Sequence, residues 1–162
     1  TYKQAAKQSG LLVGAYHWLN PTQDVSVQVD HFLQSAVVEE DDLPPVVCLE
    51  LYSTTSAVLE AKLQTFVENV ETRSGKRPLI YTSSTYWKKY LAKLEWPCEY
   101  PLWIDEPSMD WPAQLYPWAG WVLWQFSYQT KIPCVNGTIG MNWFNGNLSE
   151  LKYLAKEGLL KR

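Results

Sequence analysis

The sequence has little of what a structural metal site requires. Its three cysteines, Cys48, Cys98 and Cys134, lie far apart and form no CxxC pair, so neither a metal site nor any cofactor is expected. Cys98 and Cys134 could pair in an oxidising compartment, but three is an odd number and leaves the connectivity open.

Long apolar runs and an excess of basic residues are also absent. No run approaches the roughly 18 apolar residues of a transmembrane helix, so no membrane insertion is expected. Residues 1–10 contain Lys3 and Lys7 but no apolar core of a secretory signal. The formal net charge of -3, without a basic stripe, argues against a nucleic-acid partner.

Aromatic residues, in contrast, are abundant. The chain has nine Trp and ten Tyr in 162 residues. Many fall in the second half, namely Trp96, Trp103, Trp111, Trp118, Trp121, Trp124 and Trp143. Aromatic rings can fill a core or stack on sugar faces, and composition by itself favours the core.

Strand-like and helix-like segments alternate along the chain. Apolar runs predict strands at 11–18, 46–51, 78–82, 100–104, 121–126 and 138–143. Helical periodicity with capping residues predicts helices at 24–37, from the capping candidates 53–56 to Gly75, at 84–94 and at 148–156. The proline-rich stretch between 104 and 121 predicts a long loop.

This alternation predicts a parallel sheet covered on both faces. An open doubly wound sheet and a closed (β/α) barrel both satisfy the order of elements. No GxGxxG or P-loop follows a strand, which excludes the nucleotide-binding open sheets. Without an internal repeat or linker, residues 1–162 are expected to form one domain.

Functional groups of parallel α/β folds lie at the C-terminal ends of the strands. The residues expected there are Tyr16, His17, Trp18, Glu50, Tyr81, Trp103, Asp105, Trp124, Gln125 and Asn142. This set combines two carboxylates with aromatic and amide side chains and has no Ser/His/Asp pattern with an elbow motif. It therefore favours a sugar-binding cleft over a purely structural use of the aromatics.

Glycoside hydrolysis needs a carboxylic acid for the departing oxygen and a second group for the oxocarbenium-like carbon. Glu50 follows an apolar strand, where desolvation would keep it protonated near neutral pH. Asp105 is the other carboxylate. The alternatives are a surface glutamate at a strand end and a loop or helix-capping aspartate before Pro107.

Seven strings along the chain resemble glycoside hydrolase family 25, the Chalaropsis-type lysozymes. Gly14–Trp18 is similar to the family's GAYHF strand, 28–32 to its QAdxF helix and 43–50 to its LPPvlDvE segment. Further matches cover 75–82, 101–104, 124–126 and 142–146, in family order and at family-like spacing.

The resemblance implies a (β/α)₅β₃ barrel that cleaves the β-1,4 bond between N-acetylmuramic acid and N-acetylglucosamine in peptidoglycan. It implies that Glu50 is the proton donor and that Tyr16, Tyr81, Trp103 and Gln125 line the groove. With the other strand ends, the expected sugar contacts are Tyr16, His17, Tyr81, Trp103, Trp124, Gln125 and Asn142. A monomer that is extracellular or phage-associated and directed at the cell wall is expected.

Two acidic positions of the family are altered, since Cys48 and Gly140 stand where it has aspartates. The chain also begins where the family's second helix would run, so the first two strands are expected to be missing. Either the chain is part of a longer protein, or the barrel is a catalytically degenerate carbohydrate-binding or structural module. A third alternative is a hydrolase with Cys48 as nucleophile and His17 as base, although a buried inert cysteine fits better.

Overall fold

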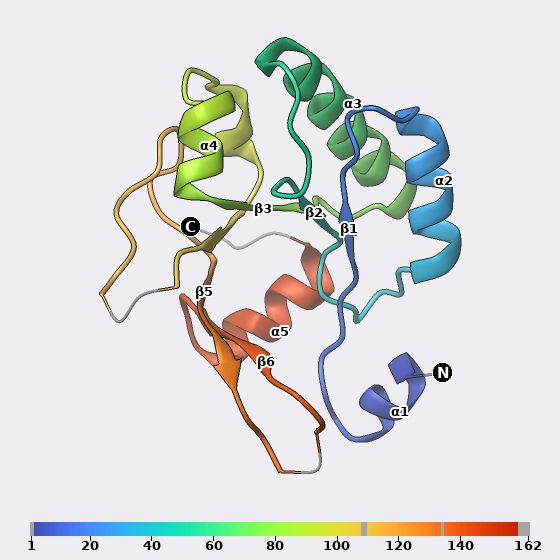
Figure 1. Cartoon of the computed structure of the whole chain (residues 1–162). Helices are drawn as coiled ribbons and strands as arrows, with labels where there is room; N and C mark the ends of the chain where they lie inside the picture. Colours follow the sequence, from blue (N-terminus) through green and yellow to red (C-terminus); the bar gives the residue numbers. More distant parts are fainter. Residues whose placement is uncertain (1, 108–109, 134, 159–162) are drawn as a thin grey trace.

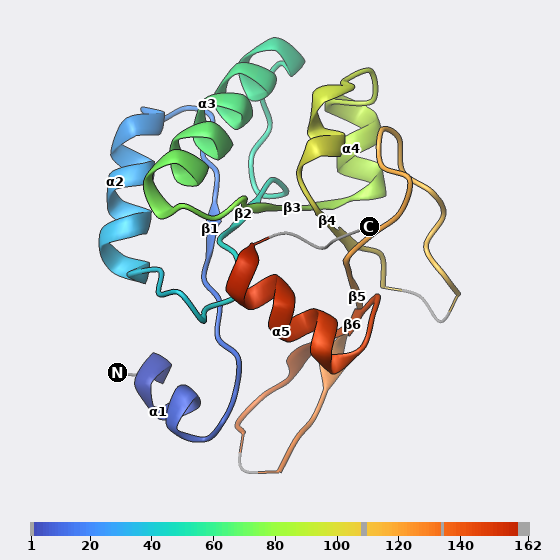
Figure 2. The ribbon, with the colours of Figure 1, turned by 180° about the vertical axis from the view of Figure 1, so that it is seen from behind.

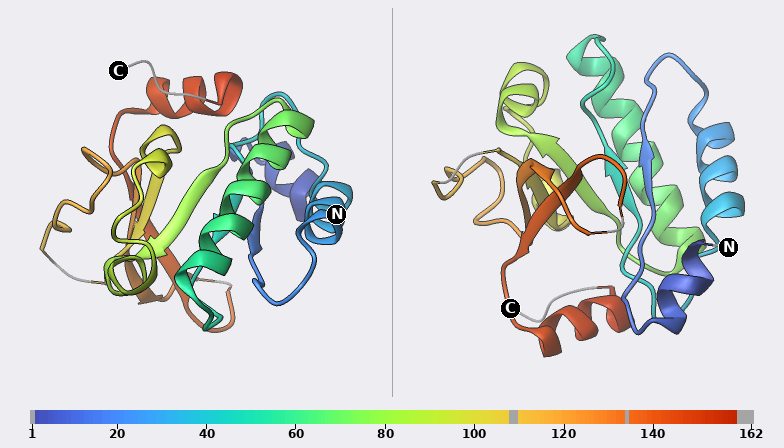
Figure 3. Two further views of the ribbon diagram at one scale, coloured as in Figure 1. Left: turned by 90° about the horizontal axis from the view of Figure 1, so that it is seen from above. Right: turned by 60° about the horizontal axis from the view of Figure 1, so that its bottom comes forward.

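A computed structural model of the chain describes residues 2–107, 110–133 and 135–158. Six strands form one sheet in the order β1-β2-β3-β4-β5-β6. They are β1 (Tyr16–Trp18), β2 (Val46–Cys48), β3 (Leu79–Ser83), β4 (Leu102–Asp105), β5 (Leu123–Thr130) and β6 (Ile139–Phe144). The sheet curls (Figures 1 and 3), and β1 and β6 are its two ends, so it forms a half-barrel.

The predicted parallel sheet is correct for β1 to β5 and wrong for the last strand. Neighbouring strands from β1 to β5 pair in parallel, whereas β5 and β6 pair antiparallel. The physical reason is the connection, residues 131–138, which is too short for the helical crossover that a parallel pair needs. All six predicted strands are present, although the first covers only the end of the run 11–18.

Capping residues predict the bounds of three helices to within about a residue, whereas the helix predicted at 84–94 ends at Tyr90 and the 3-10 helix was not predicted. The helices are α1 (Tyr2–Gln8), α2 (Val25–Ala36), α3 (Ser56–Ser74), α4 (Ser84–Tyr90), the 3-10 helix η1 (Trp96–Glu99) and α5 (Leu148–Glu157). Asp24 caps α2 and Thr55 caps α3 by accepting a backbone N–H bond. Gly75 ends α3 at a φ of 70°, where a side chain would be strained. None of the described helices has both the length and the apolar character needed to cross a bilayer.

The convex face of the sheet carries the larger core. Helices α2 and α3 pack side by side there, with α4 next to them (Figure 1). Val47, Ile80 and Ile104 point from the strands into this core and meet Phe32 and Phe66 of the helices. Because side chains alternate along a strand, their sequence neighbours point to the concave face.

The concave face of the sheet carries a second, smaller core. It contains Val46, Leu79 and Val122, and α5 covers it with Leu151 and Leu154; Figure 2 shows α5 from that side. An apolar cavity of about 250 Å³ lies next to this core and against β1. Leu43, Leu123 and Trp103 are among the residues that border it. The interior of the half-barrel is therefore only partly filled by the described residues.

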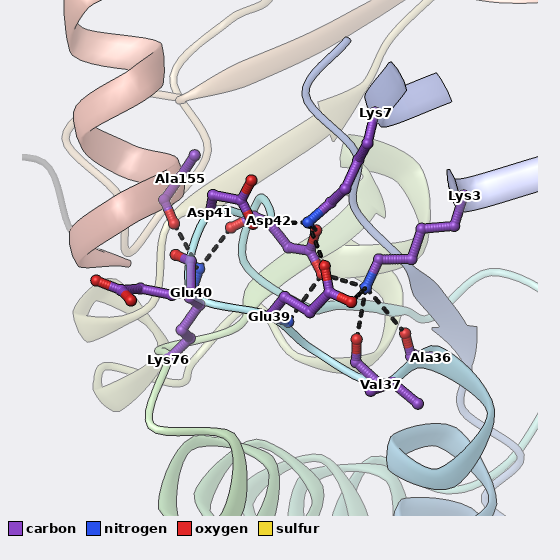
Figure 4. A network of polar contacts seen from close by, with 10 residues as sticks. All are labelled: Lys3, Lys7, Ala36, Val37, Glu39, Glu40, Asp41, Asp42, Lys76 and Ala155. Carbon is purple, nitrogen blue, oxygen red and sulfur yellow. Dashed lines mark hydrogen bonds and ion pairs between the residues drawn. The ribbon is translucent and has the colours of Figure 1, made fainter. Parts of the chain in front are cut away.

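An ion network holds the segment 37–43 between α1 and the sheet (Figure 4). Lys3 and Lys7 pair with Asp42, and Lys7 also pairs with Glu39 and Asp41. On the other side of this segment, the buried Lys76 ammonium donates to the carbonyl oxygens of Glu40, Asp42 and Ala155. The last of these belongs to the final turn of α5, whose carbonyls have no partner within the helix.

Lys76→Met should destabilise the fold, because it leaves three carbonyl oxygens without their shared donor. We expect a loss of about 2–4 kcal/mol in the free energy of unfolding, measured by urea denaturation. Lys152→Met, the same change at an exposed position of α5, is the matched control and should stay within about 0.5 kcal/mol of the unaltered protein. Equal effects of the two variants would contradict this role of Lys76.

Candidate active site

A groove of about 400 Å³ opens at the C-terminal ends of the parallel strands. It is lined by residues of the six strands and by Glu50, which follows β2; they are Tyr16, Trp18, Cys48, Glu50, Tyr81, Trp103, Gln125, Tyr128, Gly140 and Asn142. Six residues of this set were predicted from the sequence as site residues, namely Tyr16, Glu50, Tyr81, Trp103, Gln125 and Asn142. The concave face therefore brings most of the predicted site together.

Parallel register decides which side chains meet in the groove. Trp18 lies beside Cys48, and Cys48 beside Tyr81, so these side chains point to the same face. Tyr81 in turn lies beside Trp103. Glu50 follows Cys48 by two residues and points the same way, since the residue between them belongs to the convex core.

Four aromatic rings form a continuous wall of the groove. Tyr16 and Trp18 meet edge to face at 6.3 Å between centroids, Trp18 and Tyr81 at 5.8 Å, and Tyr81 and Trp103 at 5.3 Å, each at close to a right angle. The indole N–H of Trp103 donates to Asn142 Oδ1 at 2.9 Å. The wall thus combines flat apolar faces with amide groups, which suits the two faces of a sugar ring.

Glu50 is half-buried at the floor of this groove. Its Oε1 is shielded from solvent and has no hydrogen-bond partner. Burial raises the pKa of Glu50 to about 7, the negative charge of Asp105 adds to the shift, and hydrogen bonding with Ser83 opposes it. A carboxylic acid with this pKa can carry and release a proton near neutral pH.

Asp105 lies behind Glu50 and does not line the groove. It ends β4 beside Ser83 of β3 and Gln125 of β5, and only 5% of its surface is exposed. Its Oδ1 also lacks a hydrogen-bond partner. The two predicted carboxyl groups are therefore neighbours, and each has a buried oxygen without a donor.

The two altered family positions also lie in the groove. Cys48 is buried, and burial together with the charge of Glu50 raises the pKa of its thiol, so it stays a neutral thiol. Gly140 lies opposite Gln125, whose Nε2 would be 3.1 Å from an added Cβ atom. Both positions could present a side chain to the groove.

His17 and Trp124, predicted as sugar contacts, point away from the groove. The His17 ring stacks on Phe66 at 5.3 Å and contacts the Gln28 side chain at 3.2 Å. Trp124 is buried, and its indole N–H donates to the Glu106 carbonyl. Both alternate with groove residues along their strands, so a side chain at a strand end reaches the groove only from every second position. The same alternation separates His17 from Cys48, and a Cys48–His17 pair does not form.

Two groove residues were not predicted as sugar contacts: Trp18, which was expected at a strand end, and Tyr128, which was not singled out. Alternation from Tyr16 could have identified Trp18. Tyr128 has no such signal, since alternation from Gln125 would turn Ser127 rather than Tyr128 inward. The β5–β6 register shifts between Gln125 and Ser127 and again before Thr130, and such irregularities re-aim a side chain.

Among the described residues, one group of acids could offer three ligand atoms to a metal ion, Glu39, Asp41 and Asp42. The ammonium groups of Lys3 and Lys7 already pair with these carboxylates. The cluster is part of the network in Figure 4 and lies away from the groove. Cys98 is exposed; the Cys98–Cys134 pairing that the sequence leaves open involves Cys134, which lies outside the described residues.

Known proteins with similar sequences include an uncharacterised relative and a lysozyme. The chain is 33% identical over 155 residues to the uncharacterised protein YegX of Escherichia coli, with 92% of this chain and 54% of that protein covered. It is 24% identical over 162 residues to Lysozyme M1 of Streptomyces globisporus, with 93% and 55% covered. The chain thus spans about half the length of these relatives.

A solved protein structure has a similar fold. A bacterial lysozyme from Streptomyces coelicolor superposes with a TM-score of 0.88 at 21% identity, over 97% of this chain and 78% of that one. The sequence profile described as "Glycosyl hydrolases family 25" matches residues 1–135. The predicted resemblance is confirmed, and the chain belongs to glycosyl hydrolases family 25.

Proposed function

We propose that this protein is a lysozyme-type N-acetylmuramidase that hydrolyses β-1,4 glycosidic bonds in bacterial cell-wall peptidoglycan. The observation that carries the proposal is Glu50, a half-buried acid with a raised pKa on the floor of an aromatic groove. Membership of the family and the similarity to Lysozyme M1 support the reaction class and the substrate. A monomer that meets its substrate outside the cell or as part of a phage fits this function.

In the proposed reaction Glu50 is the general acid. Its proton passes to the glycosidic oxygen as the bond to the anomeric carbon breaks, and positive charge develops on that carbon. The buried Asp105 carboxylate supplies negative charge behind Glu50 and helps to keep its proton in place. Water then adds to the anomeric carbon and returns a proton to Glu50. Tyr16, Tyr81, Trp103, Gln125 and Asn142 are the proposed sugar contacts.

We also propose that the half-barrel is the later part of a (β/α)₅β₃ barrel within one domain. β1 is an end of the sheet among the described strands. A further strand at this edge would adjoin the apolar cavity beside β1. The share of the S. coelicolor lysozyme that the chain covers, 78%, is consistent with additional strands in a complete barrel.

A second candidate function is a carbohydrate-binding module without catalysis. Cys48 and Gly140 favour it, because a neutral thiol and a hydrogen atom cannot orient an acetamido group or stabilise positive charge as aspartates would. Under this alternative, peptidoglycan fragments quench the tryptophan fluorescence of the groove without releasing reducing ends.

Glu50→Gln should abolish hydrolysis, with kcat at least about 100-fold lower, because an amide has no proton to donate. Clearing of a bacterial cell-wall suspension and release of reducing ends measure the loss. Quenching of tryptophan fluorescence by peptidoglycan fragments should be retained, as a control for the groove. A Glu50→Gln protein that still cleaves would contradict the assignment.

The activity should fall as the pH rises through about 7, where Glu50 loses its proton. Asp105→Asn removes the like charge beside Glu50, so it should lower the pKa of Glu50 and move this decline to lower pH. The measurement is the pH dependence of kcat for the two proteins. An unchanged profile would exclude Asp105 from this role.

Glu50→Gln should also change how stability depends on pH. Because the pKa of Glu50 in the folded protein, about 7, exceeds its usual 4.5, its stabilising contribution is complete below about pH 4.5 and lost as the pH rises through 7. Relative to the unaltered protein, Glu50→Gln should therefore gain on the order of 1–2 kcal/mol between pH 4 and pH 8, after allowance for partial exposure. Urea denaturation at both pH values tests this, and a pH-independent difference would contradict it.

Restoring the two aspartates, with Cys48→Asp and Gly140→Asp together, should increase cell-wall hydrolysis. At position 140 an added Cβ atom requires Gln125 to shift by a few tenths of an ångström. Cys48→Asn with Gly140→Asn is the matched control, which adds side chains of the same size without the charge. Equal hydrolysis by the double aspartate variant and the unaltered protein would show that these positions do not limit the reaction.

A further inference from the structure

We propose that Trp111 and Trp143 form a second carbohydrate-binding surface, which lies on the convex face of β5 and β6 and takes uncharged sugar units of a polysaccharide chain. This surface is separate from the groove. The inference concerns binding and does not require hydrolysis; it rests on the proposed function only for the kind of polymer that the protein meets.

The register of β5 and β6 places Trp143 on the face opposite the groove. Trp124 of β5 pairs with Trp143 of β6, and Gln125 pairs with Asn142. Gln125 and Asn142 line the groove, whereas Trp124 belongs to the convex core. Residues that lie directly opposite each other on paired strands point to the same face, so Trp143 lies on the convex face beside Trp124.

Trp111 joins these two rings into one cluster. It lies in the connection between β4 and β5, where the structure describes no helix, and it stacks on Trp121 at 5.5 Å between ring centroids. The Trp111 ring also lies 5.5 Å from that of Trp124 and 6.4 Å from that of Trp143. The four rings come from separate segments of the chain and hold one another in place.

Two of these four rings are open to solvent. Trp111 is 67% exposed and Trp143 54%, whereas Trp124 is 7% exposed. Because one face of the Trp111 ring is stacked on Trp121, its exposure comes largely from the opposite face. A tryptophan that served only to close the core would be mostly buried with it, so the exposed faces of Trp111 and Trp143 are available to a ligand.

The part of the chain that carries the cluster is polar and almost uncharged. Residues 111–149 contain one charged side chain, Lys131, and Asp110 lies just before this stretch. At the edge of the cluster, the side-chain amide of the exposed Asn145 donates to the Trp121 carbonyl at 3.0 Å. Indole faces beside amide groups suit a sugar, because its C–H groups stack on the rings while its hydroxyls form hydrogen bonds. A charged ligand would need opposite charges, which this stretch hardly offers.

The size of the surface also favours a sugar over a protein partner. The exposed parts of Trp111 and Trp143 amount to roughly 300 Å². A stable protein contact, including one with a second copy of this chain, buries about 800 Å² on each partner. A surface of this size is sufficient for a short stretch of polysaccharide. Attachment there would keep the polymer close to the groove and increase the overall affinity for it.

The first test locates the binding of a soluble sugar. It uses the Glu50→Gln protein, so that the sugar is not consumed, and a soluble oligosaccharide of β-1,4-linked N-acetylglucosamine as the probe. The indole N–H signals are followed by ¹⁵N NMR and assigned with Trp→Phe variants. We expect the signals of Trp111 and Trp143 to shift during the titration, and to shift equally in Trp103→Ala, where the aromatic wall of the groove is broken.

The second test measures binding to an insoluble bacterial cell-wall suspension by co-sedimentation. In the Glu50→Gln protein, Trp111→Ala with Trp143→Ala should weaken binding about 5-fold or more, as expected when exposed aromatic anchors are truncated. Trp111→Tyr with Trp143→Tyr keeps flat rings and should retain most of the binding. Tyr2→Ala, which removes an exposed ring from α1, is the control and should change nothing. Amide spectra report the fold, and Trp143→Ala alone, which leaves the Trp111–Trp121 stack in place, replaces the double variant if that does not fold.

Three results would overturn the inference. The first is that the Trp111 and Trp143 signals stay in place throughout the titration. The second is that they shift with protein concentration in the absence of sugar, which would indicate contact between copies of the chain. The third is equal co-sedimentation of the alanine variant and its parent. Shifts at Trp111 and Trp143 without shifts at Trp18 and Trp103 would support the second surface and refute only the proposed use of the groove.

Discussion

The partial removal of two neighbouring carboxyl groups, Glu50 and Asp105, from water is the constraint around which the groove is organised. Glu50 follows β2 and Asp105 ends β4, with β3 between these strands, and Glu50 Oε1 and Asp105 Oδ1 have no hydrogen-bond partner. In water the two acids would both be ionised at neutral pH, whereas the sheet prevents them from separating. Burial raises the pKa of Glu50 to about 7 and the charge of Asp105 adds to the shift, so the proposed acid holds a proton near neutral pH.

The rest of the fold maintains this arrangement. The convex core of α2, α3 and α4 fixes the strands from one side, and α5 covers the lower part of the concave face from the other. Lys76 connects α5 to the segment before β2 through three carbonyl oxygens. Since β2 carries Cys48 and leads to Glu50, the position of the acid depends on contacts made at the opposite end of the half-barrel.

The altered positions give the groove a different character from the one that the family resemblance implies. A neutral thiol at Cys48 and a glycine at position 140 remove two negative charges from the concave face, and Glu50 and Asp105 remain as neighbouring acids there. Whether hydrolysis or binding alone is the function, the same aromatic wall of Tyr16, Trp18, Tyr81 and Trp103 forms the surface on which a sugar chain would lie.

The sequence by itself determined most of the elements, the family and the place of Glu50 at the end of an apolar strand. Apolar runs and capping residues such as Asp24 and Thr55 are local signals, and Glu50 could be recognised because it directly follows an apolar strand. Only the tertiary structure decided the direction of β6, the burial of His17 and Trp124, and the entry of Tyr128 into the groove. These depend on the short connection before β6, on the face that α2 and α3 cover and on a register shift between two strands. Each is a relation between segments far apart in the chain, so no local pattern of residues encodes it.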